Sequence, residues 1–261
     1  MRDIYRKDSV IKKVVTQGTI INNCVAEKYH CDVYGVVITP RCDLAHSGKV
    51  THVHYLPIVP LEDWFKVDGL HYLWTRALDK CNRKINDTCK KKGFPMANLK
   101  EKQLLALCDS ISDQKEKDSF KSNIGKYFEL LNMDPLDYKP NADEKGKLIE
   151  NLHKGDIPAF MLIEDWSKDD NYRVILLRDL KRLEYPIAIG MANSIEEKSI
   201  VNKWKNDLAY SANQDTIYAT EAEMVSPFVE QLMERFSYNF CRIGVEDMDE
   251  NVEEVLKNII K

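Results

Sequence analysis

Apolar and polar positions alternate in short runs over the first 60 residues. Residues 18–21, 33–39 and 50–59 are rich in valine, isoleucine, threonine and tyrosine, and glycine, proline or polar residues separate these runs. Such β-branched and aromatic runs, with a partial two-residue period, are typical of strands. The pattern therefore predicts three strands of a small curved sheet or barrel.

The period becomes helical between residues 61 and 153. In its first part, apolar side chains recur at spacings of three and four, which predicts one buried helix face. These positions are Leu70, Leu73, Trp74, Ala77, Leu78 and Cys81. Gly93 and Pro95 are expected to break this helix.

Three more helices are predicted before residue 154. Residues 99–111 and 120–133 carry further helical patterns. Asn141 followed by Glu144 predicts a capping box, in which each side chain satisfies a backbone N–H group, for a short helix through Leu152.

A strand pattern then returns. Residues 157–163 and 172–177 are apolar runs, and the polar segment 167–171 between them is rich in turn-forming residues. This arrangement predicts a β-hairpin with a five-residue loop.

The last third of the chain is predicted to be helical. Ser194 with Glu197 predicts a capping box for a helix to about residue 209. Ser226 followed by Pro227 predicts the start of another helix, and residues 251–260 predict a last one.

These elements predict an α+β fold, with a small SH3-like β-barrel or curved antiparallel sheet, a helical insertion and C-terminal helices. Residues 1–60 and 155–190 are expected to form the β-barrel-like domain. The helical insertion takes residues 61–154, and the C-terminal helical region takes residues 191–261.

Composition indicates a globular cytoplasmic protein. Of the 261 residues, 44% are hydrophobic and 31% are charged, which is too apolar for a disordered chain. No apolar run reaches the roughly 18 residues of a membrane span, and the charged N-terminus does not resemble a signal peptide. The seven cysteines are therefore expected to be reduced. The chain lacks the sequence motifs of P-loop nucleotide hydrolases, dinucleotide-dependent enzymes, zinc proteases and α/β-hydrolases.

The net charge is −4, but the charges are unevenly placed. Residues 69–133 hold 13 Lys and Arg against 8 Asp and Glu, whereas six of the ten residues 245–254 are acidic. Two solvated faces, internal pairing of the basic and acidic parts, or a surface for a polyanion would each explain this distribution. The most concentrated basic residues are predicted to follow a nucleic-acid phosphate backbone, with favourable placement at a helix end as the alternative. They are Arg83, Lys84, Lys90, Lys91 and Lys92.

The densest polar segment is residues 39–49, directly after a predicted strand. Arg41 can bind a phosphate or carboxylate there. Cysteine and histidine side chains of this segment and of the next strand could together hold zinc, which needs about four such ligands. The candidate ligands are Cys42, His46, His52 and His54. The alternatives are cysteines that only pack and a nucleophile–base pair of Cys42 with His46. We expect the sheet to present this segment beside the lysine-rich helices.

A further candidate site follows the strand at 172–177. Asp179 stands two residues before Lys181, and this spacing resembles the metal-dependent nuclease core written PD-(D/E)xK. The resemblance implies that Asp179, with Asp156 or Asp165, would bind Mg²⁺ and that Lys181 would position the attacking water. The alternative is a solvated strand end.

Residues 18–21 (Gly-Thr-Ile-Ile) and 35–40 (Gly-Val-Val-Ile-Thr-Pro) resemble the opening strands of the MazF/PemK family. The resemblance implies an SH3-like barrel and, as in many members, ribonuclease activity. Thr19 stands where that family has aspartate, and Tyr34-Gly35 stands where it has Arg-Pro. The arginine that the family uses at that point is therefore missing. Arg41, further downstream, could take its place if the backbone turns it back toward the sheet.

The chain also resembles uncharacterised bacterial proteins with a Cys-Asp-Leu strand end and a later Ser-Pro-Phe helix. The matching residues are Cys42-Asp43-Leu44 and Ser226-Pro227-Phe228, and the resemblance implies a role in phage defence or signalling. We therefore predict a cytoplasmic bacterial module that binds nucleic acid or a protein partner, in phage defence or a toxin–antitoxin-like system. The alternatives are an endoribonuclease toxin or metal-dependent nuclease, and a zinc-stabilised scaffold.

Overall fold

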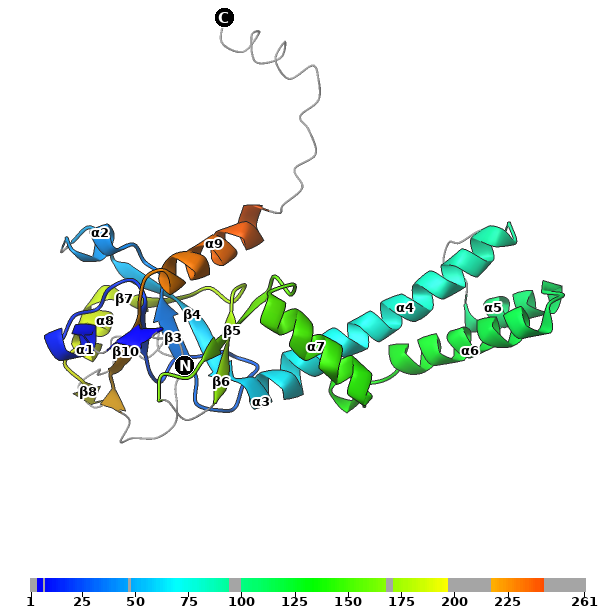
Figure 1. Cartoon of the computed structure of the whole chain (residues 1–261), viewed down its shortest axis with the longest axis horizontal. Coiled ribbons are helices and arrows are strands. Elements are labelled where there is room, and N and C mark those ends of the chain that lie inside the picture. The colour runs from blue at the N-terminus through cyan, green and yellow to red at the C-terminus, as the bar shows by residue number, and fades with distance from the viewer. Residues whose placement is uncertain are drawn as a thin grey trace, which may run out of the picture.

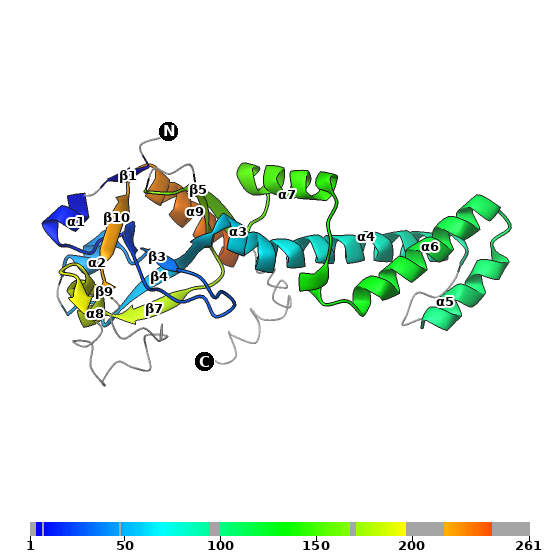
Figure 2. The same ribbon diagram turned by 90° about the horizontal axis from the view of Figure 1, so that it is seen from below.

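The chain forms a curled sheet from which a long helical arm extends (Figures 1 and 2). The structure is a computed structural model. It describes residues 4–6, 8–46, 48–93, 100–167, 171–196 and 217–241. Within these residues, every helix is too short or too polar to cross a lipid bilayer.

Eight antiparallel strands make the main sheet, in the order β1-β10-β2-β3-β4-β6-β5, with β7 also paired to β4. The sheet is strongly curled into a half-barrel. Its strands are β1 (Tyr5–Arg6), β2 (Thr19–Ile21), β3 (Tyr34–Val37), β4 (His52–Pro60), β5 (Phe160–Glu164), β6 (Tyr172–Leu176), β7 (Lys181–Glu184) and β10 (Thr220–Met224). A separate small sheet pairs β8 (Ile195–Glu196) with β9 (Ile217–Tyr218).

The curl brings the two outer strands of the sheet close together. The Tyr5 hydroxyl on β1 donates a hydrogen bond of 2.8 Å to the backbone carbonyl of Glu164 at the end of β5. Arg235 donates a hydrogen bond of 2.9 Å to the carbonyl of Phe160 at the start of β5. Because these bonds occupy outward-facing carbonyls, they protect an edge that could otherwise pair with another chain.

Helices cover both faces of the sheet. The helical elements are α1 (Asp8–Lys12), α2 (Arg41–Leu44), α3 (Leu61–Trp64), α4 (Leu70–Lys91), α5 (Glu101–Leu107), α6 (Gln114–Leu131), α7 (Ala142–Lys154), α8 (Tyr185–Met191) and α9 (Phe228–Cys241), with a π-helical turn at Phe65–Gly69. Alternate residues of the central strands, including Val36 and Ile58, form one core with Val229 and Leu232 of α9. The opposite face packs on α3, α4 and α7 at one end and on α8 at the other.

The arm consists of α4, α5 and α6, with α7 lying along the base of α4 (Figures 1 and 2). Its tip has a small core of its own, in which Ile85 and Cys89 of α4 pack against Phe120 and Ile124 of α6. The helical period expected for α4 is confirmed. Its buried residues are Leu73, Ala77, Cys81, Ile85 and Cys89. The helix ends where Gly93 adopts a left-handed backbone (φ 73°), whereas Pro95 lies outside the described residues.

Most expected local structure is present. Strands occur within the three predicted N-terminal runs, and β5 and β6 form the expected hairpin. The capping box of α7 is confirmed, because the Asn141 side chain accepts the Glu144 N–H group and Glu144 accepts that of Asn141, both at 3.0 Å. The coarse expectation of a curved antiparallel sheet combined with helices is also confirmed.

The prediction that the chain after residue 190 is only helical is wrong. Ser194 does not begin a helix, because Ile195–Glu196 is a strand, and Glu197 lies outside the described residues. Strand β10 lies inside the main sheet, between β1 and β2. Its charged Glu223 is 3% exposed and is held by Arg6 at 3.1 Å. The ion pair between Arg6 and Glu223 thus stabilises β10 within the sheet, although the sequence of this strand has weak strand propensity.

Candidate functional site

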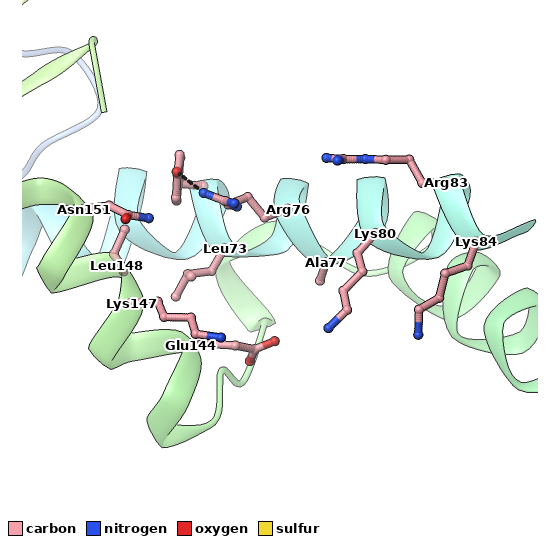
Figure 3. Close-up of a pocket in the computed structure, with 11 residues that line it drawn as sticks. Leu73, Arg76, Ala77, Lys80, Arg83, Lys84, Glu144, Lys147, Leu148 and Asn151 are labelled. Carbon is pink, nitrogen blue, oxygen red and sulfur yellow. Dashed lines mark hydrogen bonds between the residues drawn. The ribbon is translucent and has the colours of Figure 1, made fainter. Parts of the chain in front are cut away.

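The clearest candidate site is a groove between α4 and α7, with a volume of about 510 Å³ (Figure 3). Five cationic side chains line it, and we call it the basic groove. They are Arg76, Lys80, Arg83 and Lys84 of α4 and Lys147 of α7. Leu73, Ala77 and Leu148 form its apolar floor.

The helical period of α4 explains how this groove forms. Leu73 and Ala77 are buried, and they share a cluster with Leu148 of α7. Lys80 and Lys84 follow at spacings of three and four on the same face, but both are exposed. The face of α4 that is apolar under α7 therefore continues as a cationic face along the arm.

Among the described residues, none of the five groove cations forms an ion pair with a carboxylate. The one carboxylate in the lining, Glu144, already accepts hydrogen bonds from the Tyr138 hydroxyl and the Asn141 N–H group, each at 3.0 Å. The groove therefore carries an excess of positive charge, as a site for an anion requires.

Only two of the five predicted basic residues line the groove. Arg83 and Lys84 line the groove, whereas Lys90 and Lys91 lie in the last turn of α4. Lys92, just past that helix, pairs with Glu116 of α6 at 3.1 Å.

Sequence reasoning missed several lining residues. Arg76 and Lys80 could have been found, because they continue the spacing of four that leads to Lys84. Lys147 and Asn151 could not, because they come from α7 and reach the groove only through the packing of two distant helices.

The polar segment after β3 is exposed but lies far from the arm. Arg41 and Cys42 are on the short helix α2, and both side chains are exposed. Strand β4 starts near this segment and ends at Pro60, where α3 begins, so the segment and the arm lie at opposite ends of the molecule (Figures 1 and 2). The expected placement of residues 39–49 beside the lysine-rich helices is therefore wrong.

The proposed zinc ligands do not assemble. Over the described residues, which include all four candidates, no group of three or more His, Cys, Asp or Glu side chains is placed to hold a metal ion. His52 and His54 share one face of β4, opposite Glu184 and Arg182 of β7, and the ring Nδ1 of His52 lies 2.9 Å from the Thr51 hydroxyl. The other two candidates, Cys42 and His46, lie in and just after α2.

Around Asp179, no group of three or more metal-binding side chains is formed among the described residues. Lys181 is held by Asp179 and Glu27, each at 3.0 Å. Asp165 lies beyond the opposite end of β6 and accepts a hydrogen bond of 2.6 Å from Arg173 Nε. Asp165 and Asp179 are thus each engaged in an ion pair, and a Mg²⁺ site of Asp179 with Asp156 stays a prediction.

The cysteine environments lead to a labelling prediction. We expect Cys42 to react first with iodoacetamide among the described cysteine side chains, because it is the exposed one. Burial, together with nearby Asp63 and Asp32, raises the pKa of the Cys31 thiol to about 11, and burial raises the pKa of Cys24 further, so both hold little reactive thiolate.

Mass spectrometry over a time course of alkylation, at slightly alkaline pH, checks this expectation. The Cys42→Ser variant is expected to lose the fast phase and keep the slow ones. Modification of Cys31 ahead of Cys42 would contradict the half-buried environment and raised pKa described for Cys31.

No protein family, curated protein or solved structure matches this chain. The geometry of the basic groove is therefore the main guide to function.

Proposed function

We propose that this protein binds the phosphate backbone of nucleic acid through the basic groove. The observation that carries the proposal is that five cations on two facing helices form no ion pair with a carboxylate among the described residues. Lysine and arginine side chains that neutralise phosphates release condensed counterions, which supplies most of the affinity for a polyanion. Such contacts position the ligand without reading its sequence.

The alternative of pairing between the basic and acidic parts of the chain involves residues 245–254, which lie outside the described residues. A role in phage defence or in a toxin–antitoxin pair stays a prediction from the sequence resemblance.

The experiment is a titration of a fluorescently labelled oligonucleotide, followed by anisotropy over a series of salt concentrations. For the triple variant Lys80→Ala, Arg83→Ala, Lys84→Ala, we expect about a tenfold to hundredfold loss of affinity at physiological salt. The slope of log K against log salt is expected to become shallower by about 2, because each lost phosphate contact removes about 0.7 to 0.9.

A matched control removes the same number of charges elsewhere. Lys12, Lys28 and Arg182 are exposed cations on the sheet body, and their triple alanine variant is expected to keep the wild-type affinity and slope. The proposal is wrong if wild-type binding is absent or independent of salt, or if both triple variants lose affinity equally.

We further propose that the curled sheet is an SH3-like barrel. What supports this is the sharing of one long strand between two partners, since β4 pairs with β7 through residues 52–55 and with β6 through residues 58–60. The Arg-Pro step of the MazF/PemK strand has no counterpart here. Tyr34 instead lies over the Arg173 guanidinium at 4.6 Å, and Gly35 packs against Tyr55.

A further inference from the structure

The basic groove has cations on both walls and an apolar floor. This arrangement indicates whether single-stranded or duplex nucleic acid fits it. Lys80 and Lys84 of α4 and Lys147 of α7 point toward the space between the helices (Figure 3). A ligand lying between these helices would be contacted by positive charge from two sides. Leu73 and Leu148 beneath it offer a surface for an apolar face of the ligand.

The end of the groove nearest the sheet carries polar groups suited to a base. The Asn151 side chain is half-buried, and its amide has no hydrogen-bond partner among the described residues. Tyr72 lies at the same end, and its hydroxyl accepts a hydrogen bond of 2.7 Å from Arg76. An amide donates and accepts hydrogen bonds, and an aromatic ring next to a cationic groove is a common feature of sites for unpaired bases.

We propose that the basic groove selects single-stranded nucleic acid over duplex; this inference rests on the proposed function. The groove is about 510 Å³ in volume, and Leu73 of α4 and Leu148 of α7 belong to one apolar cluster at its floor. A single strand can place its phosphates between Lys80, Lys84 and Lys147 and turn one base onto the apolar floor beside Asn151. A duplex keeps its bases paired inside, so it contacts only the rim.

Competition experiments with the full chain test this preference. Unlabelled single-stranded RNA, single-stranded DNA and duplex DNA of equal length compete against a labelled single strand. We expect both single strands to bind about tenfold more tightly than the duplex, or better, because a base on the apolar floor beside Asn151 adds to the phosphate contacts.

The Asn151→Leu variant keeps every charge and removes the amide. It is expected to lose about fivefold in affinity for single strands and to leave duplex affinity unchanged, because only an unpaired base reaches this position. Asn82→Leu, an equivalent change at an exposed position of α4 away from the groove, is expected to change neither affinity. Thermal unfolding of both variants checks that the fold is kept.

Equal or tighter binding of the duplex would overturn the single-strand preference while leaving phosphate binding intact. The same holds if Asn151→Leu weakens duplex and single-strand binding alike. If the protein binds none of the three nucleic acids, the proposed function itself is refuted. Failure of the single-strand preference and failure of phosphate binding therefore give different results.

Discussion

Replacing Arg173 with methionine is expected to lower the free energy of unfolding by about 3–5 kcal/mol. The Arg173 Nε donates a hydrogen bond of 2.6 Å to the carboxylate of Asp165, and the two side chains are only 16% and 4% exposed. Removal of the guanidinium leaves a buried carboxylate without its counter-charge, which is far more costly than loss of the pair as a whole.

Aromatic packing adds to this effect. The guanidinium lies 4.6 Å from the centre of the Tyr34 ring and 4.8 Å from that of Trp166. Trp166 in turn contacts Tyr5 edge-on, with ring centres 6.0 Å apart. Arg173 therefore holds together the region where the two outer strands of the sheet approach each other, and cation–π contacts of this kind add about 0.5–2 kcal/mol.

Chemical denaturation of a matched set measures the effect. In the double variant Asp165→Asn, Arg173→Met, no buried charge is left alone, and the asparagine oxygen can still accept the Ser167 N–H group that Asp165 accepts at 3.0 Å. We expect the double variant to be more stable than Arg173→Met alone. Equal stability of the single and double variants would show that the loss comes from aromatic packing and not from the unpaired carboxylate.

The second large effect is expected for Gly35→Ala in β3, at about 3 kcal/mol of lost stability. A Cβ atom at this position would lie 2.6 Å from the Tyr55 ring and 2.7 Å from the sulfur of Cys24. Tyr55 is 6% exposed and belongs to β4, the strand paired with β3. Because both neighbours are held by the core, relief requires the sheet itself to shift.

The helical glycines supply the control for this prediction. A Cβ added at Gly125 in α6 or at Gly146 in α7 meets no atom within 4 Å. Alanine at either position is expected to raise stability by about 0.5–1 kcal/mol, because it favours the helix and restricts the unfolded chain. Urea denaturation of the three variants compares them, and a Gly35→Ala protein as stable as Gly125→Ala would refute the close packing described here.

The local elements were largely predictable because their own residues decide them. The spacing of Leu73, Ala77 and Cys81 is enough to place the buried face of α4, since one helix period repeats over many turns. The capping box of Asn141 and Glu144 is likewise a contact between residues three apart. Strand β10 was missed because its sequence, Thr-Glu-Ala-Glu-Met, has weak strand propensity and depends on Arg6 to accept a buried glutamate.

The basic groove likewise has one wall that the sequence predicts and one that only the tertiary structure supplies. Part of its charge, at Lys80, Arg83 and Lys84, follows from the sequence of one helix. The wall opposite, with Lys147 and Asn151, comes from α7, more than fifty residues away in the chain. The predicted metal ligands illustrate the converse, because residues close in sequence such as Cys42 and His46 belong to no group of three or more metal-binding side chains among the described residues.

The amino-acid order alone is thus sufficient for the periodic helices, the strand-forming runs and the concentration of positive charge in the middle of the chain. Folding decides which of those charges face each other, that Lys92 pairs with Glu116, and that the polar segment around Arg41 lies at the far end of the molecule from the arm. The reason is that local periodicity depends on neighbours a few residues apart, whereas the groove exists only once the apolar faces of α4 and α7 are buried against each other.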